Sequence, residues 1–418
     1  MEKTQKINFF IIIIYFSIIA GYLFGEDSIG GAYNDYTSHY HIAEKFNENF
    51  IFTLLNYDDL GHRHSPLFYI LKSFFINFGE NLHRIFFLHL FLLIPYFCYK
   101  CLKLTYSKVD KYYLKIFSLI LLLFPTIRSY SIWPDPHLLG TFFFIISIYF
   151  FLKFKYQEKN QFLNSLLNIF FLALASYSSP NLSLFAVYFF YEYFLKFKLS
   201  FEILIIIIFN IILSTPFFYY ILVLDINFML KDGAWNIGEN FYSLNNLSNK
   251  FIILLSIIFF YLFPIFLSGK LNFKYVSLLN KKLYLLLYIL IFVMFAYFFD
   301  FEKVYSLTNS GGGFVYNLSQ FIFKNNLLLY FISFITFVIL IIFFKYNKKN
   351  LIIILLLLLS HPQVTIWQAN FSPTIFLIIF LILDIGIKNK HFDRKFILIN
   401  YGYFLTYLIA SLFKNIIL

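Results

Sequence analysis

Apolar runs long enough to cross a bilayer recur from one end of this chain to the other. The first, INFFIIIIYFSIIAGYLF at residues 7–24, contains no charged side chain. Of the 418 residues, 61% are hydrophobic and 13% are charged, whereas soluble domains are about 45–50% apolar and about 25% charged. Inside a bilayer each segment must satisfy its own backbone polar groups, which favours helices. The sequence therefore predicts an all-α, polytopic integral membrane protein.

Hydropathy predicts about 13 transmembrane helices, with 11–13 as the range. The expected spans lie near residues 7–24, 82–101, 112–129, 136–154, 162–179, 181–197, 202–224, 250–268, 283–299, 326–344, 350–361, 371–388 and 397–413. The first span resembles a signal peptide, but no small-x-small cleavage site follows it, so we expect an uncleaved helix. The stretch SPLFYILKSFFINF at 65–78 has only 14 residues, a length that favours an interfacial or re-entrant helix.

The basic residues orient these spans. If the N-terminus is cytoplasmic and 65–78 does not cross the bilayer, the cytoplasmic segments hold 23 of the 33 Lys and Arg residues. If 65–78 did cross, the later basic loops would all face outward, against the positive-inside rule. The net charge of +12 therefore reflects topology, and no nucleic-acid partner is predicted. We expect an integral protein of a membrane such as the bacterial inner (plasma) membrane.

Ionisable side chains gather in the segments predicted to lie outside. The first outer loop, residues 25–81, is long and contains GAYNDYTSHYHIAEKF at 31–46. A transporter more often places ionisable residues within its spans, near the midplane. Here the acidic side chains that lie within spans, beyond their first residue, are Glu192 and Asp384, both towards helix ends. The one-sided clustering indicates binding or chemistry at the membrane surface.

Four short motifs follow one another within the first 200 residues. They are Asp35 eight residues before Ala43, HSPLFYIL at 64–71, Arg84 at the start of the second span, and WPDPH at 133–137. In order, spacing and membrane side they resemble the motifs of the GT-C superfamily of membrane glycosyltransferases. Within it, they are most similar to bacterial relatives of the protein O-mannosyltransferases and of the lipid A aminoarabinose transferase.

The resemblance implies a GT-C fold and a glycosyltransferase activity. A single integral membrane domain, residues 1–418, would contain a catalytic module at 1–200 and a variable transmembrane part at 201–418. A sugar would move from a polyprenyl-phosphate donor to an acceptor hydroxyl outside the cytoplasm, with inversion at the anomeric carbon. Tyr36 replaces the family's Glu, Ser65 replaces its first Pro, and LASYSSP at 174–180 lacks its Lys. The sugar, and whether the acceptor is a lipid, a glycan or a protein, therefore stay open.

The same resemblance assigns roles to particular residues. Asp35 is the expected base, with a solvated loop residue or a helix N-cap as the structural alternative. Asp135 is a second candidate carboxylate and equally a candidate N-cap for a helix beginning at Pro136. A leaving lipid phosphate requires cations around it. The candidate phosphate ligands are Arg63, His64, Arg84 and Arg128, and the candidate substrate contacts are His62, His361, Gln363, Trp367 and Gln368.

The same residues leave other functions open. A polysaccharide polymerase, or a flippase or transporter of lipid-linked glycans, is the alternative to a transferase. Asp and His are plentiful, but they lack the helical spacing of a recognised metal site, so neither a metal nor another cofactor is predicted. Gly311–Gly313 lacks the ending of a P-loop. Cys98 and Cys101 form a single C-x-x-C, which is weak evidence for redox or metal chemistry.

Overall fold

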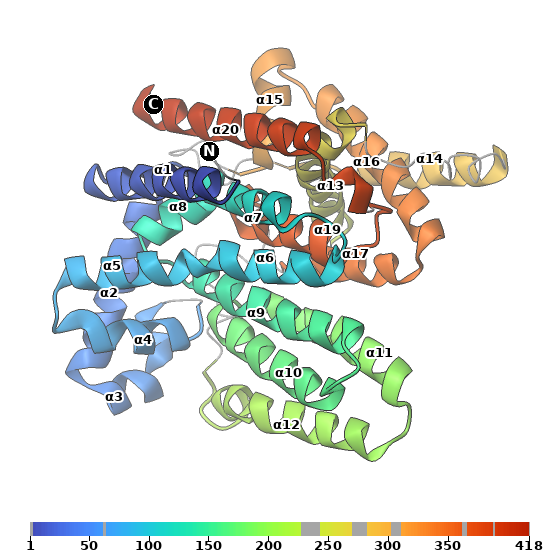
Figure 1. The fold of residues 1–418 in the computed structure, drawn as a ribbon. Coiled ribbons are helices and arrows are strands. Elements are labelled where there is room, and N and C mark those ends of the chain that lie inside the picture. The colour runs from blue at the N-terminus through green and yellow to red at the C-terminus, as the bar shows by residue number, and fades with distance from the viewer. Residues whose placement is uncertain are drawn as a thin grey trace. The chain divides into compact units, whose positions relative to one another are not determined.

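The computed structural model describes residues 3–61, 64–226, 243–269, 282–301, 311–361, 366–387 and 389–417. Within these ranges every regular element is a helix, which confirms the all-α prediction (Figure 1). The chain divides into two compact units, Met1–Met229 with Phe392–Leu418, and Leu230–His391. The sequence predicted one domain with a change of character near residue 200. That division stays a prediction; the first compact unit continues past residue 200 and includes the helix at Arg394–Ile417.

The first unit begins with the elements that carry the candidate site. They are α1 (Lys3–Leu23), α2 (Ala32–Glu48), α3 (Phe50–Leu55), the 3-10 helix η1 (Tyr57–Leu60) and α4 (Leu67–Ile76). At 10 residues α4 is about 15 Å long, half the thickness of the hydrocarbon core. The short helix expected at 65–78 is therefore present and too short to span.

Two longer segments follow. Helices α5 (Glu80–Phe91) and α6 (Leu93–Thr105) together form one candidate span of 26 residues. After them, α7 (Lys111–Leu119) with η2 (Ile120–Leu123) meets α8 (Pro125–Ile132) at a bend of 67°. Pro125 stands at the break because a proline has no backbone N–H and fits best in the first turn of a new helix.

The next four helices lie in the lower part of the ribbon (Figure 1). They are α9 (Pro136–Tyr156), α10 (Gln161–Ser178), α11 (Phe185–Phe197) and α12 (Phe201–Leu222), with η3 (Pro180–Leu184) before α11. Asn168 Nδ2 on α10 donates to the Ser147 carbonyl on α9 at 2.9 Å, and the Tyr193 hydroxyl on α11 donates to Asn168 Oδ1 at 2.7 Å. This buried polar network joins three helices.

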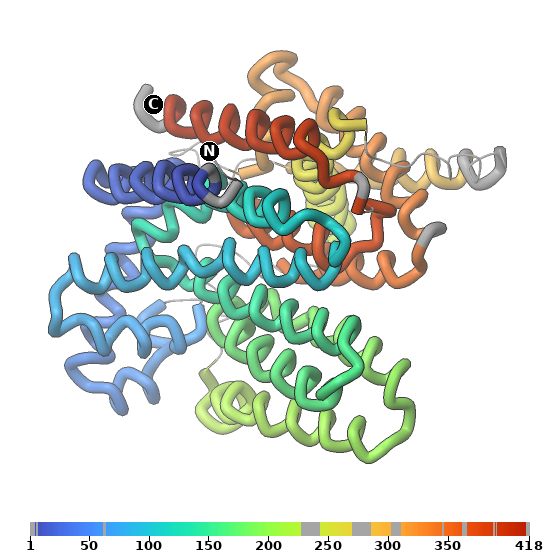
Figure 2. The backbone as a smooth tube through the Cα atoms, in the orientation of Figure 1, coloured from blue at the N-terminus to red at the C-terminus, as the bar shows by residue number. Residues whose placement is uncertain are grey.

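The last helix, α20 (Arg394–Ile417), returns to the first unit. It runs beside α1 (Figure 2), and the rings of Phe10 and Tyr401 meet with centroids 5.2 Å apart. The Tyr401 hydroxyl donates to the Ile116 carbonyl at 2.6 Å, and Ser411 Oγ donates to the Ser28 carbonyl. The first unit is therefore built from both ends of the sequence.

The second unit is built around α13 (Leu244–Leu267), which packs against helices that follow it in the chain. These are α14 (Lys282–Tyr297), α15 (Gly313–Phe323), α16 (Leu327–Tyr346), α17 (Lys349–Leu359) and α19 (Thr374–Leu381). The unit also contains α18 (Gln368–Phe371) and η6 (Asn389–His391). Asp300 accepts from Asn245 at 2.6 Å and from Asn249 at 2.9 Å, which ties the segment after α14 to the start of α13.

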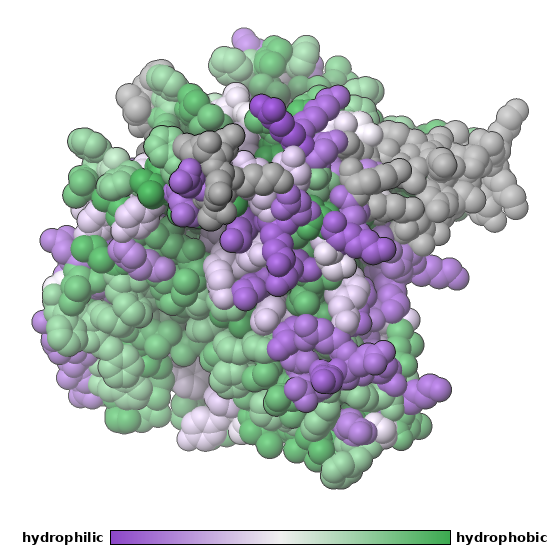
Figure 3. Space-filling view, viewed as in Figure 1, coloured by the Kyte–Doolittle hydropathy of each residue, from purple (hydrophilic) through white to green (hydrophobic). Residues whose placement is uncertain are grey.

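Six helices in the described ranges are long and apolar enough to cross a membrane, or seven if the bent pair is one span. Five more apolar helices have 10–17 residues, so the expected number of 13 stays a prediction. In α12 only 11% of the apolar window is buried, and Figure 3 shows hydrophobic side chains over much of the visible face, beside one group of hydrophilic ones. Such exposed apolar surface requires a lipid or protein environment.

Candidate active site

The segment after α1 is folded around one carboxylate, that of Asp27. Its oxygens accept from the backbone N–H groups of Gly30 at 3.0 Å, Gly31 at 2.8 Å and Tyr33 at 3.2 Å. Gly31 has φ 118°, a conformation that favours glycine. Asp27 therefore satisfies the donors at the start of α2, and the alternative expectation that Asp35 caps this helix is wrong.

Asp35 lies in the first turn of α2. Its carboxyl is solvent-accessible and makes no hydrogen bond or ion pair with the residues that the structure describes. Partial desolvation by the surrounding protein raises its pKa to about 7, and the nearby carboxylates of Asp135 and Asp27 add to the shift. An unpaired, reachable carboxyl that titrates near neutrality has the properties of a general base.

Asp135 is the N-cap of α9, as one of its two predicted roles required. Its Oδ1 accepts from the His137 backbone N–H at 2.7 Å, and its Oδ2 lies 3.3 Å from His39 Nε2. Burial alone would raise the pKa of Asp135, but the hydrogen bonds from the His39 ring and from the His137 backbone N–H stabilise the carboxylate, and the net effect is a lowered pKa. Asp135 is therefore a buried, ionised carboxylate close enough to Asp35 to affect its titration.

Histidine rings surround this carboxylate. Besides its contact with Asp135, the His39 ring packs edge-on against His64, with centroids 5.4 Å apart, and His64 packs against His137 at 4.8 Å. His137 Nδ1 lies 3.1 Å from Ser179 Oγ. The structure thus brings together Asp35, Asp135 and His64, three of the predicted site residues. His62 and Arg63 lie outside the described residues.

Arg84 stands beside this group but is held by the protein itself. Its guanidinium lies 3.7 Å from the Trp133 ring centroid, and its Nε donates to the Ile132 carbonyl at 3.0 Å. Nη1 is 3.9 Å from Glu80, and Nη2 is buried with no hydrogen-bond partner among the described residues. Arg84 is only 9% exposed. It therefore joins α5 to the end of α8 and presents no open face to a phosphate.

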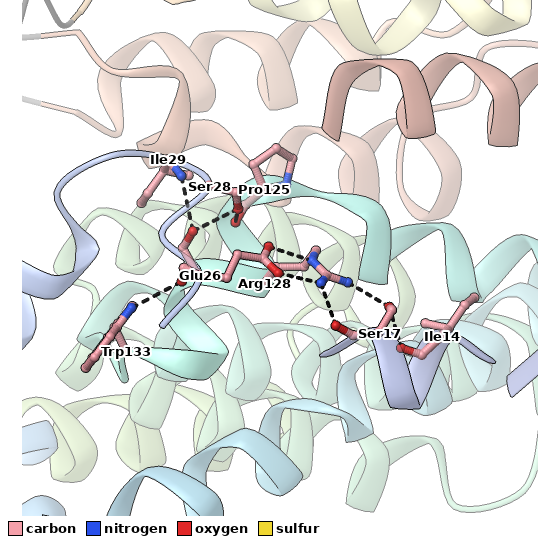
Figure 4. A network of polar contacts seen from close by, with 9 residues as sticks. Ile14, Ser17, Glu26, Ser28, Ile29, Pro125, Arg128 and Trp133 are labelled. Carbon is pink, nitrogen blue, oxygen red and sulfur yellow. Dashed lines mark hydrogen bonds and ion pairs between the residues drawn. The ribbon is translucent and has the colours of Figure 1, made fainter. Parts of the chain in front are cut away.

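The Arg128 guanidinium makes more hydrogen bonds within the protein than that of Arg84. Its Nε and Nη2 donate to the two carboxylate oxygens of Glu26 at 2.7 and 2.5 Å, and Nη1 and Nη2 donate to Ser17 Oγ and the Ser17 carbonyl at 3.1 and 3.0 Å (Figure 4). Trp133 Nε1 donates to the Glu26 carbonyl at 3.2 Å. Every guanidinium nitrogen of Arg128 has a partner, so the expected phosphate ligand is a clamp between α1 and α8.

A buried cation that the sequence analysis did not single out lies on α4. Lys72 is fully buried; its Nζ is 3.9 Å from the Tyr36 ring centroid and donates to the Tyr36 carbonyl at 3.4 Å. Burial lowers its pKa well below the usual value. A lysine in an apolar interfacial stretch normally extends towards water. Only the packing of α4 on α2 shows that this side chain points inward.

The late candidates belong to the second unit. His361 is 9% exposed, and its ring centroid lies 4.3 Å from that of Phe371. Trp367 is the N-cap residue of α18, and Gln368 Oε1 accepts from the Phe314 backbone N–H at 2.7 Å. Gln363 lies outside the described residues. The contacts described for His361 and Gln368 hold the second unit together.

An apolar cavity of about 620 Å³ opens within the first unit. The residues Ser65, Pro66, Leu67 and Ile70 line it on one side, next in the chain to His64. Its other walls come from α10, η3, α11 and α12, and include Leu172, Ala173, Leu213, Phe217 and Tyr220. The cavity is large and apolar enough to bind part of an acyl or prenyl chain.

No group of three or more His, Cys, Asp or Glu side chains in the described ranges is placed to hold a metal ion. The site is therefore made of two unlike carboxylates, three histidine rings and an adjoining apolar cavity. Compared with known proteins, the chain matches no family model, no curated protein sequence and no solved structure.

Proposed function

We propose that this protein is a membrane glycosyltransferase that moves a sugar from a polyprenyl-phosphate donor to an acceptor hydroxyl on the extracytoplasmic face, with inversion. The observation that supports it best is the pair of Asp35 and Asp135. Asp135 is locked and ionised, whereas Asp35 is reachable, unpaired and titrates near neutrality. A base of that pKa accepts a hydroxyl proton in the transition state without being permanently protonated at pH 7.

The surroundings of this pair suit a lipid-linked substrate. The apolar cavity begins at Ser65–Leu67, directly after His64, whose ring lies in the same cluster as His39 and His137. A prenyl chain in the cavity would leave its phosphate near this end of the loop. The acceptor oxygen would then attack the anomeric carbon with Asp35 taking its proton, while the bond to the lipid phosphate breaks.

The proposal is tested by sugar transfer in membranes. Wild-type protein and the Asp35→Asn variant are each given a panel of radiolabelled polyprenyl-phosphate sugars. We expect at least one sugar to be transferred by the wild type and the rate to fall by about 10²- to 10⁴-fold in Asp35→Asn, because a general base contributes roughly that factor.

A matched control is Asp59→Asn, which removes an exposed carboxylate from η1 in the same loop. It should transfer at the wild-type rate. If Asp35→Asn also transferred at that rate, Asp35 would not be the base. If lipid-linked sugar crossed the bilayer but no sugar changed its acceptor, a flippase would replace the transferase as the explanation.

A further inference from the structure

Tyr69, His39 and Asp135 form a continuous hydrogen-bonded chain in the interior of the first unit. The Tyr69 hydroxyl is 3.1 Å from His39 Nδ1, and His39 Nε2 is 3.3 Å from Asp135 Oδ2. The three residues come from α4, α2 and the start of α9, and they are respectively 0%, 3% and 3% exposed. Elements that are distant in the sequence therefore converge on one histidine.

Hydrogen-bonding capacity fixes the direction of this chain. An ionised carboxylate only accepts, so His39 Nε2 must carry the hydrogen that lies towards Asp135. Burial lowers the pKa of His39, which keeps the ring neutral despite the opposing effect of Asp135. In a neutral imidazole the other nitrogen accepts, so Nδ1 accepts from the Tyr69 hydroxyl. Tyr69 thus selects the tautomer that can hold Asp135.

The two oxygens of Asp135 are held from different directions. The His137 backbone N–H holds Oδ1 at 2.7 Å, and His39 holds Oδ2. A buried carboxylate that accepts a hydrogen bond at each oxygen is held in one orientation and stays ionised. Asp35 is one helical turn before His39 on α2, a separation that places the two side chains on the same side of that helix.

We propose that His39 is a positioning residue of the transfer reaction: held by Tyr69, its Nε2–H fixes the Asp135 carboxylate beside the base Asp35. The inference rests on the proposed function, because positioning has meaning only for a reaction. Removal of His39 would leave Asp135 buried without one of its two donors. Asp135 would then be protonated at a higher pH, and its repulsion of the Asp35 carboxylate would weaken.

Other charged groups surround the pair and stay in place in the variants below. Asp27 precedes α2, and Glu44 lies on α2. Lys72 is on α4, and α5 carries Glu80, His83 and Arg84. Among the residues that the structure describes, His64 and His137 complete the set. Because these groups are common to all variants, a change that follows His39 alone reports on its contact with Asp135.

The first measurement needs no substrate. The infrared absorption of protonated carboxyl groups is followed against pH in the full-length protein, with Asp35→Asn and Asp135→Asn used to assign the bands. The test variant is His39→Phe. His39→Gln keeps an N–H donor near the position of Nε2, and His41→Phe changes an exposed histidine of the same helix whose neighbour is Glu44 at 3.5 Å.

In the wild type and in His41→Phe, we expect Asp35 to titrate near pH 7 and Asp135 to be ionised already at lower pH. In His39→Phe, the Asp135 band should persist to higher pH and the Asp35 band should vanish at lower pH. His39→Gln should restore the wild-type order. If His39→Phe titrates like His41→Phe, the proposal is overturned. If His39→Phe does not fold, Tyr69→Phe must show a smaller shift in the same direction.

The second measurement is the pH dependence of kcat/KM for sugar transfer. His39→Phe should lower kcat by a factor on the order of 10², as a displaced catalytic group does, with KM little changed, and should move the acidic limb of the profile to lower pH. A wild type that transfers no sugar would overturn the proposed function, while the infrared titration would still decide whether His39 controls Asp135.

Discussion

Asp35 and Asp135 are identical side chains with opposite environments. Asp135 is buried and accepts from His137 and His39, whereas Asp35 is reachable and has no partner in the described part of the chain. Burial raises the pKa of both carboxyl groups, but only at Asp135 do hydrogen bonds outweigh this effect. One carboxylate therefore supplies a fixed charge and the other a titrating group, which is how acid and base roles are commonly divided.

The raised pKa of Asp35 makes activity and stability change in opposite directions with pH. Transfer should rise as pH increases through about 7, because the base must be ionised. An Asp in an unfolded chain titrates near pH 3.9, so between about pH 4 and 7 the folded protein binds more protons than the unfolded chain. The free energy of unfolding should therefore fall across this window.

The check is to record transfer rate and thermal unfolding of detergent-solubilised protein across this range. Asp35→Asn cannot ionise, so it should lose part of the fall in stability and be the more stable protein at pH 8, although its transfer rate should be far below that of the wild type. Asp59→Asn should follow the wild type in both curves. Equal pH slopes for Asp35→Asn and wild type would show that the Asp35 pKa is not raised.

The sequence predicted some of these residues and not others, for physical reasons. Asp35 and Asp135 were found because each stands in a short motif of fixed spacing. Their proximity could not be read from the chain, since 100 residues separate them and only the packing of α2 on α4 and of its aromatic side chains on Trp133 brings them together. The role of His39 depends on contacts among three elements, and the burial of Lys72 depends on the direction in which its side chain points. Neither can be read from sequence spacing.

At the scale of elements, hydropathy located the helices but not their breaks. The run at 112–129 was predicted as one span, whereas the helix bends by 67° before Pro125. This bend places Arg128 against α1 and not towards a ligand. Apolar character sets where a helix forms, but the partner of a polar side chain within it depends on tertiary packing.

The Arg128–Glu26 pair should be a major support of the α1–α8 contact. Both side chains are buried, 5% and 8% exposed. Arg128→Met would leave the Glu26 charge without its partner, and loss of one member of a buried pair costs about 3–5 kcal/mol. We expect a clearly lowered melting temperature, partly restored in the Glu26→Gln/Arg128→Met double variant.

The comparison variant for this pair is Glu44→Gln, whose partner His41 is exposed. An exposed pair contributes about 0–1 kcal/mol, so its melting temperature should be close to that of the wild type. An Arg128→Met protein as stable as Glu44→Gln would show that the buried pair does not support the fold.

At the scale of the whole molecule, membrane topology connects the candidate site to its substrate. The segment Glu80–Thr105 is a candidate span of 26 residues, and it separates η1 from the turn between α6 and α7. If it crosses the bilayer with the predicted orientation, the candidate site is extracytoplasmic and the α6–α7 turn is cytoplasmic.

This orientation predicts opposite labelling of two single cysteines. Asp59→Cys in η1 should react with an impermeant maleimide added to intact cells, and Lys108→Cys in the α6–α7 turn should react only after the membrane is opened. The native Cys98 and Cys101 are buried and should stay unlabelled. Labelling of both positions from the same side would show that Glu80–Thr105 does not span.

The return of α20 to the first unit has a consequence for biosynthesis. Ribosomes deliver a chain from its N-terminus, and domains generally fold in that order. Here α1 and α7 receive contacts from a helix that follows the second unit in the chain, so it is synthesised after that unit. The surfaces of α1 and α7 that contact α20 therefore have no partner helix while the second unit is being made, and the first unit cannot be completed before the second has been synthesised.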